Sequence, residues 1–387
     1  MAIELSKNLK SVPENVFAPV LKLVAEESAK GKVLLNAAVG VPDSDTPELL
    51  LEELEKAIRK PENMRYGNFD GKEILLEKIS EFLNRKYGVK VNPKTEIALL
   101  FGSKFGLAAI PSVLLNEGDL VFSPVPGYPD YIPAFKLAGA QIHDIELQEK
   151  DNYLVNYEKI SEEDARRAKL IYLNYPSNPT GAVASKEFYE ETVVWAKKNN
   201  VIVLQDHAYA DFYYKEGISP SFLQVEGAKE VGIELFSFSK NFSMSGYRIG
   251  FAVGNEEIIR GLKEFNNIFN ANIYGAIQDT VILGLDNYDK ITGQIKKIYT
   301  ERLEKITRKL DELGYEYFSP KGGIFIWLKA KDGDTGQQFF EKLLNNHNIV
   351  TMPGQVFGRG GEDYVRVSLS IKDQQIDTLL AELEKIN

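Results

Sequence analysis

Short apolar runs alternate with amphipathic stretches over the first two thirds of the chain. Helices are predicted at Pro47–Ile58, Lys72–Tyr87 and Ser185–Asn199, where apolar side chains recur at helical spacing. Buried strands are predicted at six short apolar runs: Ile97–Phe101, Asp119–Pro124, Lys169–Asn174, Val201–Asp206, Ile233–Ser239 and Gly250–Gly254. Strands that alternate with helices in this way predict an α/β fold with a mainly parallel sheet sandwiched by helices.

The pattern changes after a long helical stretch at Tyr288–Gly314. Shorter elements follow, including the strand-like runs IFIWLKA and YVRVSLS and a helical stretch near Gly336–Asn346. We therefore interpret residues 46–287 as a large domain and residues 288–387 as a smaller α+β domain. Residues 1–45 do not fit the sheet pattern, and we expect this N-terminal segment to join the smaller domain.

Composition narrows the class of function. The chain has 387 residues and a formal net charge of −10, which argues against a nucleic-acid partner. It has no cysteine, so disulfides, thiolate metal sites and a cysteine nucleophile are excluded. The three histidines, His143, His207 and His347, show no metal-ligand spacing, so we expect no metal site and no Ser-His-Asp hydrolase. We interpret His207 as structural.

The chain also lacks the sequence marks of a membrane or exported protein. No apolar run approaches the roughly 20 residues that a membrane span needs. The N-terminus, MAIELSKNLKSVPENV, has no charged start followed by an apolar stretch. We therefore expect a cytoplasmic protein with no membrane partner.

Polar residues follow several predicted strands, where doubly wound sheets bind ligands. Gly102 and Ser103 precede a helical run and could form either an anion site or an ordinary helix N-cap. The stiff loop PGYPDY presents Tyr128, which could stack on a planar ring or belong to the core. Asn178 lies between two prolines in YPSNPTG, where it could direct one hydrogen bond or form an Asx turn.

Three charged residues at or near predicted strands are further candidates. Asp206 ends an apolar strand, so it is either a buried carboxylate in need of a cation or a helix N-cap, and Tyr209 follows close by. Lys240 lies in SFSKNFSMSGYRIG, and strand parity would point it away from Ser237 and Ser239; a solvated surface lysine is the alternative. Arg366 lies within a strand, either as a fork for a carboxylate or as an edge-strand surface residue.

Together these positions supply an anion cradle, a stacking ring, a directed hydrogen bond, a buried anion and an amine, which are the needs of one cofactor. The stretch SFSKNFSMSGYRIG resembles the lysine signature of class I/II aminotransferases, which are fold type I enzymes of pyridoxal 5′-phosphate (PLP). The run PSFLQVEGAKEVGIELFSFSK most resembles the LL-diaminopimelate and alanine-type subgroup. Other motifs occur in the family's order: GVPDSDTP, YGNFDG, GSK, PGYPDY, YPSNPTG, DHAYADF, KGGIFIW and YVRVSLS.

The resemblance implies a role for each candidate residue. Lys240 would bond PLP covalently and move a proton, and Asp206 would pair with the pyridinium nitrogen. Tyr209 and Asn178 would bond the 3′ oxygen of the ring, on which Tyr128 would stack. The resemblance also implies the residues that hold the phosphate: Gly102, Ser103, Lys104 through its backbone, Ser237, Ser239 and Arg248.

It further implies a homodimer, in which Tyr66 reaches the phosphate of the neighbouring subunit. Arg366 would bind the substrate α-carboxylate with help from the Gly40 backbone and Asn178. The implied reaction moves an amino group from an L-amino acid to a 2-oxo acid, with 2-oxoglutarate expected, by a ping-pong mechanism.

Two other functions stay open at this point. A carbon–sulfur β-lyase of the same fold would turn over without 2-oxoglutarate. A non-catalytic ligand-binding protein would have no use for the catalytic set formed by Lys240, Asp206, Tyr209 and Arg248, which is complete here.

Three positions depart from the family's commoner pattern: Val41, Asn68 and Phe69. They border the expected side-chain pocket, so the substrate does not follow from the resemblance. No clear second arginine is present for a distal carboxylate, which leaves neutral or aromatic amino acids open.

Overall fold

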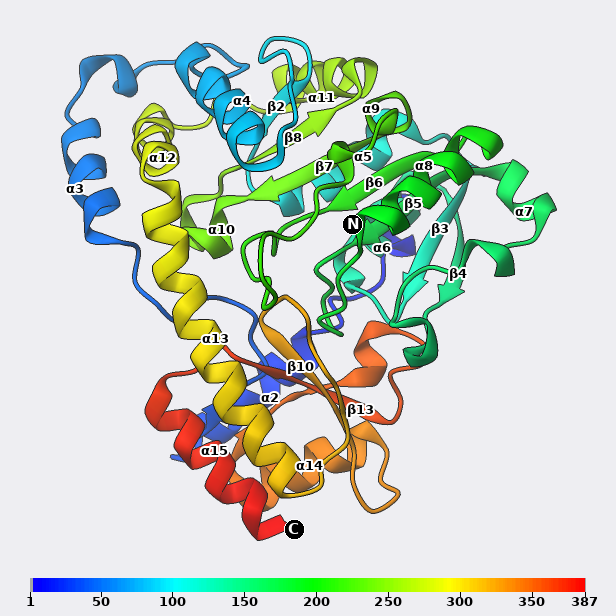
Figure 1. The fold of residues 1–387 in the computed structure, drawn as a ribbon, viewed down its shortest axis with the longest axis vertical. Helices are drawn as coiled ribbons and strands as arrows, with labels where there is room; N and C mark the ends of the chain where they lie inside the picture. Colours follow the sequence, from blue (N-terminus) through cyan, green and yellow to red (C-terminus); the bar gives the residue numbers. More distant parts are fainter. Residues whose placement is uncertain (1–2, 387) are drawn as a thin grey trace.

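The computed structural model describes residues 3–386, and its largest element is a seven-stranded sheet (Figure 1). The strand order is β2-β8-β7-β6-β5-β3-β4, and only β8 runs antiparallel to its neighbours. The predicted α/β fold with a mainly parallel sheet is thereby confirmed. The strands are β2 (Ile97–Leu100), β3 (Leu120–Val125), β4 (Gln141–Glu146), β5 (Ala168–Asn174), β6 (Ile202–Asp206), β7 (Gly232–Ser237) and β8 (Gly250–Gly254).

The edge strand β4 has no counterpart among the predicted strands. Its sequence QIHDIE is polar at alternate positions and largely exposed, so it gives no apolar run. It pairs only with β3, in parallel. An edge strand with one solvated face needs less apolar surface than a central strand.

Helices cover both faces of this sheet. Leu204 and Leu235 face α5 and α11, whereas the adjacent Val203 and Phe236 belong to the hydrophobic cluster that contains α4 and α8. Successive strand residues point to opposite faces, so the central strands need apolar side chains at nearly every position. The helices named here are α4 (Glu73–Tyr87), α5 (Ser103–Leu114), α8 (Lys186–Asn199) and α11 (Glu256–Phe269).

A second, antiparallel sheet has the order β12-β13-β10-β9. Its strands are β9 (Tyr317–Phe318), β10 (Phe325–Lys329), β12 (Met352–Pro353) and β13 (Tyr364–Ser368). The helices α14 (Gly336–His347) and α15 (Asp373–Ile386) lie beside it, and α13 (Tyr288–Glu312) runs from the large sheet to this region (Figure 1). Because β13 lies between β12 and β10, the alternative of an edge strand at Arg366 is wrong.

The N-terminal segment pairs with the C-terminal part of the chain. The strand β1 (Leu35–Asn36) runs parallel to β11 (Ile349–Val350), and the backbone N–H of Ser368 donates to Ala37 O at 2.8 Å. These bonds place residues 35–37 beside the second sheet, although the division into domains stays a prediction.

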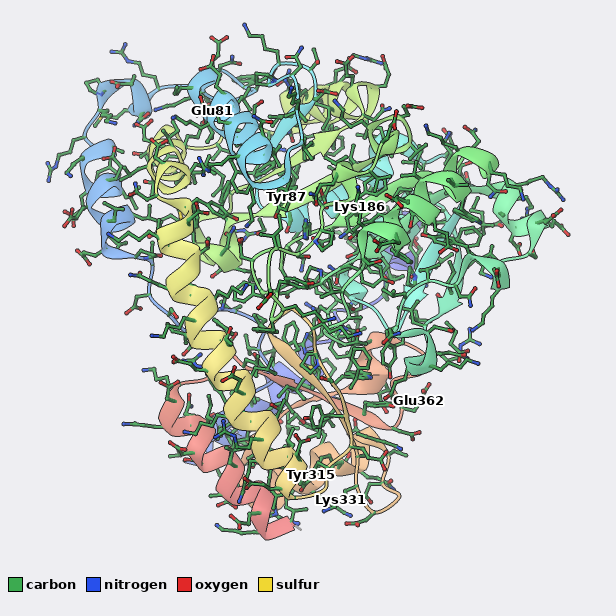
Figure 2. The ribbon with its side chains drawn as sticks, in the orientation of Figure 1. Glu81, Tyr87, Lys186, Tyr315, Lys331 and Glu362 are labelled. Atoms are coloured by element: carbon green, nitrogen blue, oxygen red, sulfur yellow. The ribbon has the colours of Figure 1, made fainter. Side chains whose placement is uncertain are left out.

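The remaining helices complete the layers. They are α1 (Lys7–Ser11), α2 (Ala18–Ala29), α3 (Glu48–Ala57), α6 (Ile132–Leu137), α7 (Glu162–Arg167), α9 (Ala228–Val231), α10 (Phe238–Asn241) and α12 (Gly275–Asp286). Charged side chains such as Glu81 and Lys186 lie on the outside, whereas Tyr87 at the end of α4 is buried (Figure 2). Within residues 3–386, none of the helices has the length and apolar character that crossing a membrane requires.

Candidate active site

A cavity of about 640 Å³ lies where the carboxyl ends of β5, β6 and β7 approach β10 and β13. Most of the candidate residues line it. They are Gly40, Ser103, Lys104, Tyr128, Asn178, Asp206, Tyr209, Ser237, Ser239, Lys240, Arg248 and Arg366. Gly102 does not line the cavity but lies against Arg248, which does. Tyr66 lies outside the cavity, and 84% of its surface is exposed.

Lys240 lies on the short helix α10, which begins directly after β7. The strand ends at Ser237, so the predicted strand parity of Ser237, Ser239 and Lys240 is wrong. The Ser237 hydroxyl caps the helix by accepting the N–H of Ser239 at 3.2 Å. This turn directs Lys240 into the cavity, where its Nζ donates to the Gly40 carbonyl oxygen. The alternative of a solvated surface lysine is therefore wrong.

The environment of Lys240 favours the neutral amine. Removal from water lowers its pKa to about 8, and the positive charges of Arg366 and Arg248 act in the same direction. The negative charge of Asp206 opposes this shift. At pH 7 an amine with this pKa is in its nucleophilic form in roughly a tenth of molecules, which is a far larger share than for an ordinary lysine, whose pKa is near 10.4.

Asp206 is a buried carboxylate without an ion-pair partner among the described residues. Its Oδ1 accepts the backbone N–H of Ala208 at 3.1 Å, and its Oδ2 accepts the hydroxyl of Tyr172 at 3.2 Å. Burial raises the pKa of Asp206 to about 6, although both hydrogen bonds lower it. The N-cap alternative is wrong, because turns and not a helix follow β6.

Arg366 projects from β13 into the same cavity and bonds two separate segments. Its Nη1 donates to Asn178 Oδ1 at 2.7 Å, and its Nη2 donates to Ala38 O at 2.6 Å. The guanidinium lies 4.1 Å from the ring centroid of Phe325. Burial lowers the pKa of Arg366 to about 10, and its buried Nε has no hydrogen-bond partner among the described residues.

The N-terminus of α5 forms an anion cradle with Arg248. Gly102 has φ +80°, and a Cβ there would lie 2.4 Å from Arg248 Nη2, so only glycine permits this approach. Gly250 is equally restricted, because a Cβ there would lie 2.5 Å from Phe236 O and 3.1 Å from the backbone N of Ser103. The free N–H groups of a helix N-terminus, with an arginine beside them, suit a phosphate.

Aromatic side chains form the walls. The Tyr128 hydroxyl donates to Asp130 Oδ2 at 2.5 Å, and the ring of Tyr128 lies 6.4 Å from that of Phe17. The ammonium of Lys104 also donates to Asp130 at 2.5 Å, which directs this side chain toward Asp130. Tyr209 packs edge-on against Phe325, with ring centroids 5.7 Å apart.

The sequence patterns did not reveal several residues of the cavity. Asn15, Phe17 and Leu21 come from the N-terminal segment, for which no local pattern indicated a place in the site. Tyr172 does not line the cavity but bonds Asp206, and it could have been found because it lies two residues before Asn174 on β5 and therefore points to the same face of the sheet. His207 does not line the cavity, and its Nε2 lies 3.2 Å from Ser219 Oγ.

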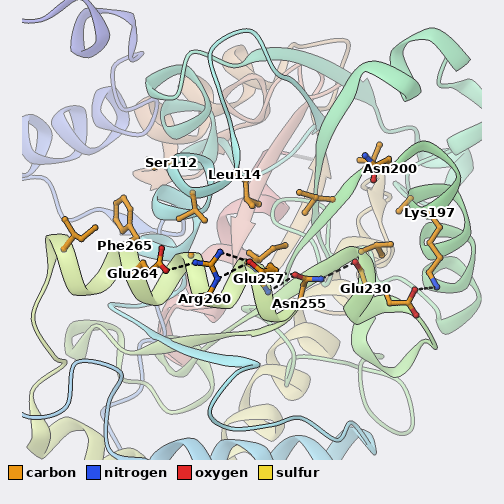
Figure 3. Close-up of a pocket in the computed structure, with 18 of the residues that line it drawn as sticks. Ser112, Leu114, Lys197, Asn200, Glu230, Asn255, Glu257, Arg260, Glu264 and Phe265 are labelled. Carbon is orange, nitrogen blue, oxygen red and sulfur yellow. Dashed lines mark hydrogen bonds and ion pairs between the residues drawn. The ribbon is translucent and has the colours of Figure 1, made fainter.

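A larger hollow of about 810 Å³ lies elsewhere, between α5, α8 and α11 (Figure 3). Its charged groups are paired with one another: Arg260 bonds Glu257 and Glu264, and Lys197 bonds Glu230. None of the candidate residues lines it. The reactive groups of the candidate set therefore belong to the smaller cavity.

Comparison with known proteins connects this cavity to one family. The family model described as aminotransferase class I and II matches residues 32–383. Transaminase BacF of Bacillus subtilis (strain 168) is 38% identical over 389 residues, covering 100% of this chain and 97% of that protein. An LL-diaminopimelate aminotransferase of Dehalococcoides mccartyi (strain CBDB1) is 37% identical over 382 residues, covering 98% of each chain.

A solved structure resembles the whole chain as well. The apo structure of BacF from Bacillus subtilis superposes with a TM-score of 0.95 at 38% identity. The match covers 100% of this chain and 99% of that chain. Both the N-terminal segment and the second sheet therefore have counterparts in that structure.

We predict that Lys240 titrates near pH 8 in the protein without cofactor, because burial and the charges of Arg366 and Arg248 disfavour its cation. Its reactivity toward trace acetic anhydride should rise with pH and level off above pH 8, whereas an ordinary lysine keeps gaining reactivity beyond pH 10. Peptide mass spectrometry measures the acetylation of Lys240 and of the ordinary lysines at each pH.

The matched variant is Arg366→Gln, which removes one of the charges that disfavour the cation. Its midpoint should move to higher pH. A Lys240 midpoint near pH 10 in the unmodified protein would contradict the assignment of a shifted amine.

Proposed function

The chain belongs to the class I and II aminotransferases, a family of PLP enzymes, and we propose that the cavity around Lys240 is its active site. In this proposal the enzyme moves an amino group from an L-amino acid to a 2-oxo acid, with 2-oxoglutarate as the acceptor, by a ping-pong mechanism. The observation that carries the proposal is that one cavity holds the Lys240 amine, whose pKa is lowered, the unpaired carboxylate of Asp206 and Arg366 with an unpartnered Nε.

The cavity fits PLP in three ways. The Asp206 carboxylate is buried without a cation, which suits a protonated ring nitrogen. The cradle of Gly102, Ser103 and Arg248, with Ser237 and Ser239 beside it, suits a phosphate. Tyr128 suits the ring face, while the Tyr209 hydroxyl and the Asn178 amide suit the 3′ oxygen.

When bound, PLP supplies a conjugated, electron-withdrawing ring that stabilises negative charge at the substrate Cα. Lys240 would hold the cofactor covalently until the substrate amine replaces it, and its freed amine would then take and return the Cα proton. Asp206, held by Ala208 N–H and Tyr172, keeps a proton on the ring nitrogen and thereby maintains the withdrawal of electrons.

The substrate carboxylate is assigned to Arg366. Its Nη1 and Nη2 already bond Asn178 and Ala38, and its Nε is free to donate. Asn178 and the backbone of Gly40 lie beside it in the cavity. Fixing the carboxylate in this way orients Cα–H toward Lys240, which is the positional part of the rate enhancement.

We assign amino donors, that is, substrate amino acids, with uncharged side chains to this site. Arg366 and Arg248 are the arginines among the described lining residues, and both have other roles in the proposal. The remaining cation at the edge, Lys104, is matched by Asp130. Apolar side chains contribute much of the rest of the lining: Phe17, Leu21, Val39, Val41 and Met352.

We also propose a homodimer in which Tyr66 completes the phosphate site of the partner. Tyr66 is exposed far more than a core tyrosine and does not line the cavity of its own chain. Its loop is fixed by the bond from Gly67 N–H to Asn272 Oδ1, at 3.1 Å. Further exposed apolar side chains occur in these parts of the chain: Met64, Phe69, Ile268, Phe269 and Tyr274. The cytoplasmic location stays a prediction.

The proposed reaction is tested with purified protein, PLP, 2-oxoglutarate and a panel of amino donors. We expect glutamate formation with at least one neutral donor, and Lys240→Ala should abolish it because both the anchor and the base are lost. The variant should still bind PLP without a covalent bond, as followed by absorbance and by dialysis. Turnover that needs no 2-oxo acid would indicate a β-lyase, and near-normal turnover in Lys240→Ala would refute the role of this residue.

Asp206→Asn should keep the fold but lower the transamination rate, by on the order of 10²-fold. Asparagine retains an acceptor for Ala208 N–H, but it cannot hold the proton on a ring nitrogen by charge. Stopped-flow measurement of a single half-reaction isolates this step. An unchanged rate would mean that the ring nitrogen has a different partner.

The dimer is tested by mixing two inactive or impaired variants, Tyr66→Ala and Lys240→Ala, under conditions that exchange subunits. If Tyr66 acts across the interface, each mixed dimer regains one site with both residues intact, and activity should rise above that of either variant alone. A mixture no more active than its components would show that Tyr66 acts within its own chain, or that no dimer forms. Sedimentation velocity distinguishes these two outcomes.

A further inference from the structure

The helix α13 contacts the surroundings of Lys240 at its first residue. The Tyr288 hydroxyl donates to Asp211 Oδ2 at 2.5 Å and accepts from Asn241 Nδ2 at 3.0 Å. Asp211 also bonds Lys86, and all these groups are buried or nearly so. Since Asn241 directly follows Lys240, the start of α13 holds the helix that carries the reactive amine.

The same helix carries Arg302 about four turns further on. Arg302 bonds Asp43 with both arms of its fork, from Nη1 to Oδ1 at 2.6 Å and from Nη2 to Oδ2 at 2.9 Å. Its Nε donates to Asp373 at 3.0 Å, and its Nη1 also donates to Leu369 O at 3.1 Å. The side chains of Arg302 and Asp43 are 8% and 16% exposed, so solvent screens this pair only weakly.

Asp43 ends the loop that carries Gly40. The beginning of this loop is held by Ala37, whose N–H donates to Val350 O and whose carbonyl accepts from Ser368 N–H, both at 2.8 Å. Across residues 39–42, all of them described, one backbone hydrogen bond is present, and it runs from Lys240 Nζ to Gly40 O. Arg366 Nη2 holds the beginning of the loop at Ala38 O, and the bond between Asp43 and Arg302 anchors its far end.

We propose that Arg302 is a positioning residue: through Asp43 it holds the loop of residues 38–43 against Lys240, and so sets the substrate side of the cavity. Val39, Gly40 and Val41 line the cavity from this loop. One helix then fixes both partners of the contact between Lys240 and Gly40. The inference rests on the proposed function only in assigning the substrate to this side of the site.

Asp373 provides a matched control, because it bonds the same arginine without belonging to the loop. Its side chain is 76% exposed and lies at the start of α15. A loss of charge at Asp373 therefore removes one bond of Arg302 but leaves the anchor of the loop in place.

The first experiment measures, in the full chain, amide hydrogen exchange at the start of the loop. There Ala37 N–H donates to Val350 O and Ala38 N–H donates to Asn36 Oδ1, so both amides are protected while the loop is held in place. The double variant Arg302→Gln with Asp43→Asn removes both charges, so no unpaired charge is left in the interior. Exchange in the loop should become at least tenfold faster in this variant, while Asp373→Asn should match the unmodified protein. Arg302→Lys keeps the charge but not the fork, and should give an intermediate rate. If the double variant does not fold, Arg302→Lys alone decides the outcome.

The second experiment measures kcat and KM for the amino donor with saturating 2-oxo acid. A loosened loop should raise KM by about tenfold in the double variant with a smaller change in kcat, because substrate placement and not the amine is altered. Loop exchange and KM equal to those of Asp373→Asn would overturn the proposal. If no donor is turned over by the unmodified protein, the proposed function fails, and the exchange rates still decide whether Arg302 anchors the loop.

Discussion

The burial of the Asp206 carboxylate is the constraint on which the site depends. Nearly continuous apolar strands bury the end of β6, and two neutral donors, Ala208 N–H and the Tyr172 hydroxyl, are all that this carboxylate receives from the described residues. The cavity also brings Arg366 close to Lys240, and the positive charge of Arg366 makes protonation of Lys240 less favourable. Burying an unpaired anion and a lysine amine is unfavourable in a folded interior, and one cofactor with a protonated ring nitrogen and an aldehyde relieves both.

The parts of the fold that follow from local patterns were predicted well. The central strands are apolar on both faces because helices cover both faces, and this is visible in the sequence as short apolar runs. The edge strand β4 was missed for the opposite reason, since its solvated positions are polar. The strand prediction also failed after Ser237. The Ser237 hydroxyl accepts the N–H of Ser239 and caps a helix, and the alternation of apolar and polar positions gives no sign of this helix.

The rest of the site depends on contacts between distant segments. Phe17 reaches Tyr128 from the N-terminal segment, and Asp43 meets Arg302 across 259 positions of the sequence. Neither contact leaves a periodic signal near its own residues, so no local pattern could have revealed it. Residues such as Asp206 and Arg366 were found because a charge inside an apolar strand is unusual in itself.

The bond between Arg366 and Asn178 connects the two sheets at the place where the substrate is proposed to bind. Arg366 comes from the second sheet and Asn178 follows β5 of the large sheet, yet the two side chains bond at 2.7 Å. A carboxylate can bind an arginine at two points, through two parallel N–H···O bonds, and Nε with the adjacent terminal nitrogen is one such pair. In the proposed site, a carboxylate bound through Nε and Nη2 would share Nη2 with Ala38 O and would leave the bond from Nη1 to Asn178 intact. In this arrangement the guanidinium proposed to bind the substrate also keeps the two halves of the cavity in place.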